Sequence, residues 1–200
     1  MSNQEASSVR ESLPIQEPSA RRRILDATYS LVEERGMAQV SMTAIADKAG
    51  VSRQTVYNKF PDVETAMLGY VLDELARTAT RIEQSLSTLR DPENQIRSFV
   101  TELIRRFAQQ DFQVSIQAAM SPTAVEAIEE ATWPLRTMLE EILAEGVETG
   151  QFVSHIASER LATLLFQMTV GVGHLALSGA DVDSLADDAA TLIAASVSAP

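Results

Sequence analysis

SMTAIADKAGVSRQTVYNKF, at residues 41–60, predicts two short helices joined by a tight turn. The two predicted helices cover residues 42–49 and 53–59. Ser41 and Ser52 are good N-caps for them, and Gly50 lies where the end of a helix favours a residue that can adopt positive φ. A helix, a short turn containing glycine and a second helix are typical of the helix-turn-helix unit that reads DNA.

The second predicted helix carries polar side chains that suit contact with DNA. Val56 and Phe60 are four residues apart and point inward. The side chains left for the outer face are those of Arg53, Gln54, Thr55, Tyr57, Asn58 and Lys59. Arginine can pair bidentately with guanine and glutamine or asparagine with adenine, whereas tyrosine, threonine and lysine suit phosphate oxygens. This helix alone is equally compatible with an ordinary solvated amphipathic helix; the turn and the helix before it favour DNA.

Residues 21–69 resemble the DNA-binding domain of the TetR (tetracycline-repressor-like) family of one-component regulators. The residues that carry the resemblance are Arg22, Ile24, Leu25, Thr28, Gly36, Ser41, Thr43, Ile45, Ala46, Ala49, Gly50, Val51, Ser52, Thr55, Tyr57 and Phe60. The resemblance covers about a quarter of the chain in detail. It is specific because many positions agree at fixed spacing.

Two positions depart from the pattern of the family. Gln54 stands where the family usually has glycine or alanine, and a long amide there can reach a base edge and add specificity. Val63 stands where the family usually has a lysine that contacts phosphate. Lys59 is the nearby cation that would replace this contact. With Arg22 and Thr43 added, the predicted DNA contacts are Arg22, Thr43, Arg53, Gln54, Thr55, Tyr57, Asn58 and Lys59.

The charge of the chain is unevenly distributed. Its formal net charge is −12, which on its face argues against nucleic acid. Residues 1–60, however, hold eight Lys or Arg against seven Asp or Glu, whereas residues 61–200 hold eight against twenty-one. The acidic excess therefore lies outside the predicted DNA-binding domain, and affinity must come from a focused set of phosphate contacts.

Composition excludes several other kinds of protein. There is no cysteine, and the two histidines, His155 and His174, lie nineteen residues apart, so we expect no metal site and no cofactor. So few candidate general bases argue against an enzyme. No apolar run approaches the length of a membrane span, which predicts a cytoplasmic protein with no membrane partner. The remaining alternative is a helical protein-interaction module without sequence-specific DNA binding, which leaves the polar face of residues 53–59 unexplained.

Three segments are predicted along the chain, and the fold class is all-α because no strand-like alternation occurs. They are a disordered N-terminal tail (residues 1–19), a three-helix helix-turn-helix DNA-binding domain (residues 20–66) and a helical effector-binding and dimerisation domain (residues 67–200). The first helix begins near Ala20, with Arg21, Arg22 and Arg23 in its first turn. Positive charge there opposes the helix dipole, so we expect a DNA phosphate to compensate at least one of these arginines. Later helices are expected to start near Val63, Pro92, Pro122 and Pro134 and to cover residues 156–178 and 181–197.

The middle of the chain is rich in Met and aromatic residues, which line adaptable apolar cavities. The candidate effector-pocket residues are Phe99, Leu103, Phe107, Phe112, Ile116, Met120, Trp133, Met138, Phe166 and Met168. Trp133, at a helix junction before Pro134, is the best single candidate. The alternative for each of them is an ordinary position in a helical core.

The last two helices are expected to form the dimer interface, because in the TetR family they pair across a two-fold axis as a four-helix bundle. The candidate interface residues are Leu164, Met168, Gly171, Gly173, His174, Leu175, Leu185, Ala189 and Leu192. Gly171 and Gly173 would allow close approach, and His174 is expected at the interface or in the core. The resemblance thus implies a homodimeric repressor that a small molecule releases from a palindromic double-stranded DNA operator.

Overall fold

The computed structural model describes residues 18–109, 119–153, 155–176 and 180–199. Its helices are α1 (Ala20–Arg35), η1 (Met37–Gln39), α2 (Met42–Ala49), α3 (Arg53–Tyr57), α4 (Val63–Leu86), α5 (Pro92–Gln109), α7 (Pro122–Ala131), α8 (Trp133–Glu148), α9 (Ser158–Ala176) and α10 (Val182–Val197). Within these described ranges the only β-type pairing is an isolated bridge between Phe152 and Ser198. The prediction of an all-α fold is confirmed.

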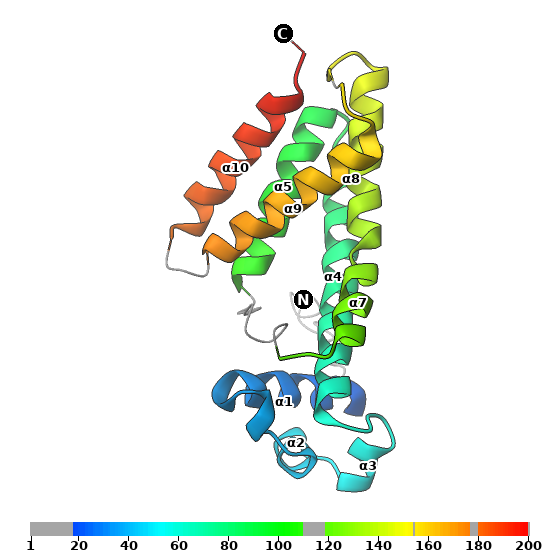
Figure 1. The fold of residues 1–200 in the computed structure, drawn as a ribbon, viewed down its shortest axis with the longest axis vertical. Coiled ribbons are helices and arrows are strands. Elements are labelled where there is room, and N and C mark those ends of the chain that lie inside the picture. Colours follow the sequence, from blue (N-terminus) through cyan, green and yellow to red (C-terminus); the bar gives the residue numbers. More distant parts are fainter. Residues whose placement is uncertain (1–17, 110–118, 154, 177–179, 200) are drawn as a thin grey trace, which may run out of the picture.

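The molecule consists of a small head, formed by α1, α2 and α3, and a larger body formed by α5 and α7–α10. Figure 1 shows the head at the lower end and the long helix α4 rising from it into the body. Most of the predicted tail, residues 1–17, lies outside the described residues. None of the described helices is long and apolar enough to cross a membrane.

Local chemistry explains the helices of the head. The side chains of Ser19, Ser41 and Ser52 each accept a hydrogen bond from the backbone N–H three residues later, at 3.1–3.2 Å. Gly50 ends α2 in the left-handed region, with φ 64° and ψ 39°, as its position in the turn predicted. Helix α3 ends at Tyr57, two residues before the predicted boundary at 59, and Asn58 is its C-cap.

Helix α4 is joined tightly to the head. Its N-cap is Asp62, whose carboxylate accepts a hydrogen bond of 2.7 Å from the backbone N–H of Thr65, and this bond lowers the pKa of Asp62. A Cβ added at Gly69 would lie 3.1 Å from the ring of Phe60 and 3.3 Å from Leu25. The glycine therefore allows a close approach between α4 and the head.

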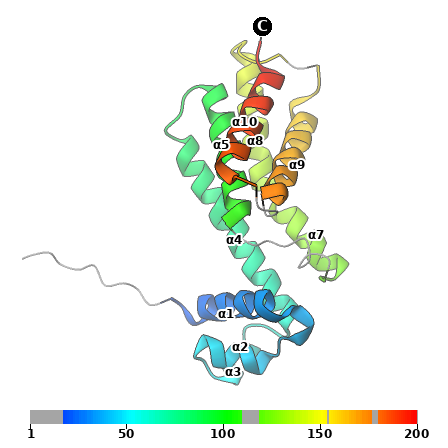
Figure 2. The same cartoon turned by 90° about the vertical axis from the view of Figure 1, so that its left-hand side faces the viewer.

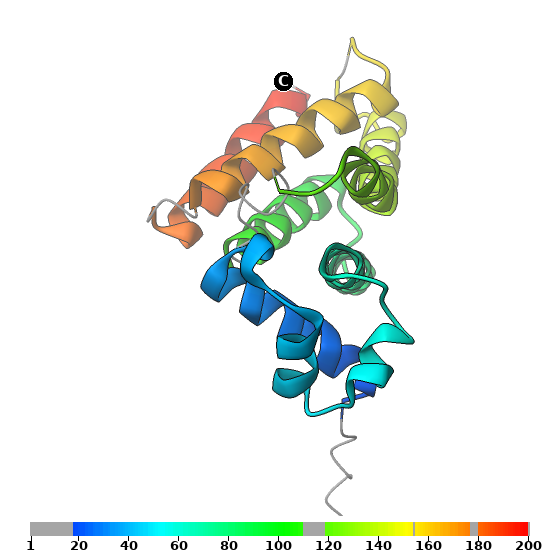
Figure 3. The ribbon, with the colours of Figure 1, turned by 60° about the horizontal axis from the view of Figure 1, so that its bottom comes forward.

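The body is built around α5, which packs against α4, α8, α9 and α10. Phe99, Leu103, Leu139 and Phe166 are among its fully buried side chains. Figures 2 and 3 show α9 and α10 side by side at the surface of the body, and Figures 1 and 3 place α10 on the side of α5 away from α4. Helices α9 and α10 therefore each keep one face free for another molecule.

Two apolar clusters correspond roughly to head and body. The head cluster continues along α4 to Val71 and also takes in Met120, Ala124 and Ile128 beside and within α7. The body cluster begins at Ile82, and Phe107 packs against both clusters. The division at residue 66 stays a prediction, since the apolar contacts of the head extend past it.

Candidate DNA-binding surface and effector cavity

Helix α3 presents a row of polar side chains to solvent. Val56 is completely buried beneath it, which fixes the opposite face outward. Arg53, Gln54, Tyr57, Asn58 and Lys59 are all exposed, while Thr55 and Thr43 of α2 are half-buried. Figure 1 places α3 at the end of the molecule farthest from the body. This surface can enter a DNA groove without interference from the acidic body.

Two of the predicted base-reading side chains are already paired with each other. Nε2 of Gln54 donates a hydrogen bond of 2.8 Å to Oδ1 of Asn58, one helical turn later. This leaves the carbonyl oxygen of Gln54 as an acceptor and the amide nitrogen of Asn58 as a donor. Together they can meet the donor and acceptor that adenine presents in the major groove.

Replacing Gln54 with alanine is expected to relax sequence specificity at one or two operator positions, by about 1–3 kcal/mol. The change removes one reader and the partner that orients Asn58. Binding to matched and singly mismatched operators would be compared by fluorescence anisotropy. Gln39→Ala, an exposed glutamine of the head outside α3, is the control. An equal loss on matched and mismatched DNA would show that Gln54 does not read a base.

Two of the three arginines at the start of α1, Arg21 and Arg22, meet carboxylates of the protein itself, where the sequence suggested a DNA phosphate. Arg21 donates to Asp73 of α4 at 2.7 Å. Arg22 pairs with Asp26 and, at 2.7 Å, with Glu74 of α4. Burial lowers the pKa of the Arg22 guanidinium, but its hydrogen bonds to Glu74 and Asp26 outweigh that effect and hold the pKa above its ordinary value. Arg22 therefore ties α1 to α4, and its predicted DNA contact is not supported by this geometry.

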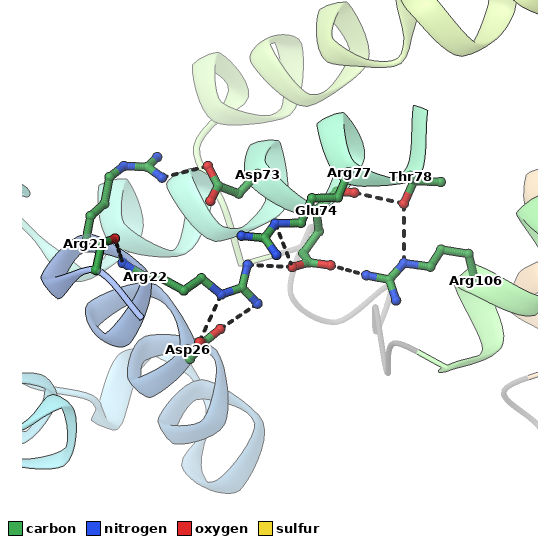
Figure 4. A network of polar contacts seen from close by, with 9 residues as sticks. Arg21, Arg22, Asp26, Asp73, Glu74, Arg77, Thr78 and Arg106 are labelled. Atoms are coloured by element: carbon green, nitrogen blue, oxygen red, sulfur yellow. Dashed lines mark hydrogen bonds and ion pairs between the residues drawn. The ribbon is translucent and has the colours of Figure 1, made fainter. Parts of the chain in front are cut away.

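Glu74 is the centre of a polar network between head and body. Its side chain is only 4% exposed, and it pairs with Arg22 of α1 and Arg106 of α5. Nε of Arg106 also donates to the hydroxyl of Thr78 at 3.3 Å. Figure 4 shows Glu74 pointing between the two guanidinium groups, which approach it from opposite sides. One carboxylate on α4 thus contacts both α1 and α5.

A cavity of about 220 Å³ lies against this network. Its lining residues are Glu74, Leu75, Thr78, Leu103, Arg106, Phe107, Ile128, Glu129, Thr132, Phe166, Gln167, Val170 and His174. Glu74, Thr78 and Arg106 form a polar part of the wall on α4 and α5, and apolar side chains of α4, α5, α7 and α9 form most of the remainder, together with the polar residues Glu129, Thr132, Gln167 and His174. An apolar cavity with a few convergent polar groups is the usual form of a small-molecule site.

The structure places only some of the predicted pocket residues at this cavity. Leu103, Phe107 and Phe166 line it. Phe99 is fully buried in the body core outside the lining, Met138 packs against that core, and Met120 belongs to the head cluster. Phe112 and Ile116 lie outside the described residues.

Trp133 and Met168 are at the surface, contrary to their proposed place in the pocket. Their side chains are 62% and 48% exposed, respectively. Beside the three predicted residues, the cavity is lined by residues of α4, α7 and α9 that were not among the pocket candidates. The sequence did contain one signal for this part of the lining. Glu74 and Thr78 lie on the same face of α4 as the buried residues Met67, Tyr70 and Val71. An acidic residue on an otherwise apolar helix face is a candidate functional residue.

The candidate dimer residues divide into two groups. Leu164, Met168, Gly171 and Leu175 form one exposed stripe on α9, and Leu192 is exposed on α10. The other four, which contact their own subunit or are only partly exposed, are Gly173, His174, Leu185 and Ala189. A Cβ at Gly173 would lie 2.7 Å from Cβ of Phe107, and Ala189 is buried.

His174 is also turned toward its own subunit. Its ring lies edge-on to that of Phe107, with the ring centroids 5.9 Å apart, and it lines the cavity. The sequence placed it at an interface or in the core rather than against a ligand. Leu185, in contrast, is half-buried on α10. Among the residues that the structure describes, no three His, Asp or Glu side chains could hold a metal ion together.

Comparison with known proteins agrees with this arrangement. Residues 24–64 match the family described as "Bacterial regulatory proteins, tetR family". HTH-type transcriptional regulator Rv2250c of Mycobacterium tuberculosis is 41% identical over 54 residues, which cover 27% of this chain and 29% of that protein. The match thus spans less than a third of that relative's length.

Two further similarities extend over most of the chain. HTH-type transcriptional regulator AqdR of Rhodococcus erythropolis is 29% identical over 181 residues, covering 86% of this chain and 83% of that protein. The crystal structure of the transcriptional regulator FadR from Bacillus subtilis in complex with stearoyl-CoA has a TM-score of 0.78 at 17% identity, covering 86% of this chain and 97% of that one. At that identity the structural similarity shows the fold. The sequence of the head therefore matches the tetR family of bacterial regulatory proteins, and the chain as a whole shares its fold with a regulator of known structure.

Proposed function

We propose that the protein is a DNA-binding transcriptional regulator that responds to a small molecule. The observation that carries this proposal is the exposed row on α3 and the two residues after it, formed by Arg53, Gln54, Tyr57, Asn58 and Lys59. These side chains combine two amides for base edges with cations and a hydroxyl for phosphates. A protein-interaction module would leave that combination of side chains unexplained.

The cavity in the body supports the ligand-dependent part of the proposal. It is lined by residues of α4, α5, α7 and α9, and α4 is the helix that carries the head. The related fold of FadR from Bacillus subtilis holds stearoyl-CoA, so a helical body of this kind can accommodate a ligand. A ligand with different affinity for two positions of α4 would shift the head between them.

We further propose that two copies assemble through α9 and α10. Four exposed apolar residues, Leu164, Met168, Leu175 and Leu192, lie on these adjacent helices. Such apolar surface is typical of an interface between subunits. In the homodimer the two α3 helices would read successive major grooves of a palindromic operator, about 34 Å apart. Release of the operator by the ligand would make the protein a repressor acting in the cytoplasm.

A binding-site selection from genomic DNA with the purified full-length protein tests the proposal. We expect enrichment of a palindromic sequence whose half-sites are about one helical turn apart. A variant in which Arg53 and Tyr57 are both alanine should enrich nothing. Recovery of no preferred sequence by the wild type, with the protein folded and dimeric, would favour an interaction module instead.

Replacing Lys59 with alanine is expected to weaken binding to every DNA sequence alike. If Lys59 replaces the phosphate contact that Val63 cannot make, the slope of log K against log salt should fall by about 1 per contact, or about 2 per dimer. Lys48→Ala is the matched control, because Lys48 is the only other lysine and pairs with Glu34. An unchanged slope for Lys59→Ala would remove it from the phosphate contacts.

A further inference from the structure

The network around Glu74 has more positive than negative charge. Among the described residues it contains Arg22, Arg77 and Arg106 against Asp26 and Glu74. Arg22 uses both carboxylates, and Arg77 lies 3.9 Å from Glu74 and is half-exposed. Three guanidinium groups thus share two carboxylates, and Arg106, whose side chain is 18% exposed, is the one of the three that borders the cavity.

Arg106 has donors to spare for a ligand. A guanidinium carries five N–H groups. Nε donates to Thr78 and Nη2 to Glu74, and no described residue accepts a hydrogen bond from Nη1. Glu74, in contrast, already faces three guanidinium groups. A ligand cation at Glu74 would have to displace an arginine, whereas an anion can bind Arg106 directly.

The rest of the cavity sets the size and shape of that anion. Leu103, Phe107, Phe166 and Val170 supply an apolar wall beside Arg106. An engineered apolar cavity of about 150 Å³ holds benzene, so the 220 Å³ here accommodates one ring with a small charged substituent. Glu129, the other carboxylate of the lining, is exposed, and solvent screens its charge.

We propose that the effector is a small aromatic carboxylate, which binds Arg106 and in doing so breaks the Arg106–Glu74 ion pair. This inference rests on the proposed ligand-responsive function and names its ligand class. The ring lies against Phe107 and Phe166, and the carboxylate takes the donors of Arg106. Bidentate pairing of arginine with a carboxylate is among the strongest polar contacts in proteins.

Competition for Arg106 couples the cavity to the head. Without the ligand, Glu74 on α4 is held by Arg106 of α5 and by Arg22 of α1. When a ligand carboxylate takes Arg106, Glu74 keeps its ties to the head and loses its tie to α5. Helix α4 and the head are then freer to move together relative to the body, which changes the spacing of the two heads.

Isothermal titration of the purified full-length protein with matched acids and amides tests the proposal. The pairs are benzoate with benzamide and phenylacetate with phenylacetamide, and benzylamine serves as the cation. We expect at least one acid to bind about 10- to 100-fold more tightly than its amide, as a charge-assisted contact requires. Equal binding of acid and amide, binding of benzylamine alone, or binding of neither acid would overturn the proposal.

Three variants locate the contact. Arg106→Gln should lose the preference for acid over amide, and Arg106→Lys should keep part of it. Arg105→Gln is the control, because the neighbouring Arg105 faces away and pairs with Asp183. Acid binding by Arg106→Gln equal to that of the wild type would overturn the assignment to Arg106.

The variant Glu74→Gln tests whether Glu74 competes with the ligand for Arg106 or only stabilises the structure. Because Glu74 competes with the ligand for Arg106, the variant should bind the acid several-fold more tightly than the wild type does. Weaker acid binding by a folded Glu74→Gln protein, with normal circular dichroism, would contradict the exchange. These titrations contain no DNA, so they separate this inference from the DNA-binding proposal: failure of the site selection leaves their result standing.

Discussion

Replacing both Leu164 and Leu192 with glutamate is expected to yield a folded monomer that no longer binds operator DNA. Both side chains are more than half exposed in the subunit, so their replacement leaves its core intact. In a two-fold interface each change occurs twice, and an unpaired buried charge costs about 3–5 kcal/mol. Light scattering coupled to size-exclusion chromatography measures the mass, and anisotropy measures DNA binding.

Val147→Glu is the control for that experiment. Val147 is another exposed apolar residue, 43% accessible, but it lies on α8 outside the proposed interface. It should leave both the dimer and DNA binding unchanged. If the Leu164 and Leu192 double variant remained dimeric, the subunits would have to meet elsewhere.

Gly173→Leu is expected to destabilise the subunit itself, by about 1–3 kcal/mol or more. The side chain would be forced against Phe107, since even a Cβ lies 2.7 Å from Cβ of that residue. Thermal unfolding should show a melting temperature lower by about 2–4 °C per kcal/mol.

Gly171→Leu is the matched comparison, two residues away on the same helix. Nothing lies within 4 Å of a Cβ at Gly171, and the residue is exposed in the middle of the apolar stripe on α9. Subunit stability should be kept or raised by up to about 1 kcal/mol, because leucine is a better helix former than glycine. Its effect should appear only as weaker dimerisation. Equal unfolding of both variants would contradict the separation of the two glycines.

The head could be predicted from sequence because its signals are local. Ser41, Gly50 and Ser52 act on backbone groups within three or four residues, and so the boundaries of α2 and the turn follow from residue type alone. The apolar spacing around Val56 likewise decided which side chains of α3 face outward. Charge and composition added the contrast between a mildly basic head and an acidic body.

The cavity and the junction were decided by packing between distant segments. Arg22 and Glu74 are 52 residues apart in the sequence, and Glu74 and Arg106 are 32 residues apart. No local sequence pattern therefore predicts either contact. The same holds for Gly173. The sequence suggested that this glycine lies at the interface between subunits, whereas in the fold it packs against Phe107 of its own subunit. Periodicity shows that a helix has an apolar face. The arrangement of the helices in three dimensions decides which neighbour covers that face. It also decides which side chains, such as Trp133, remain exposed.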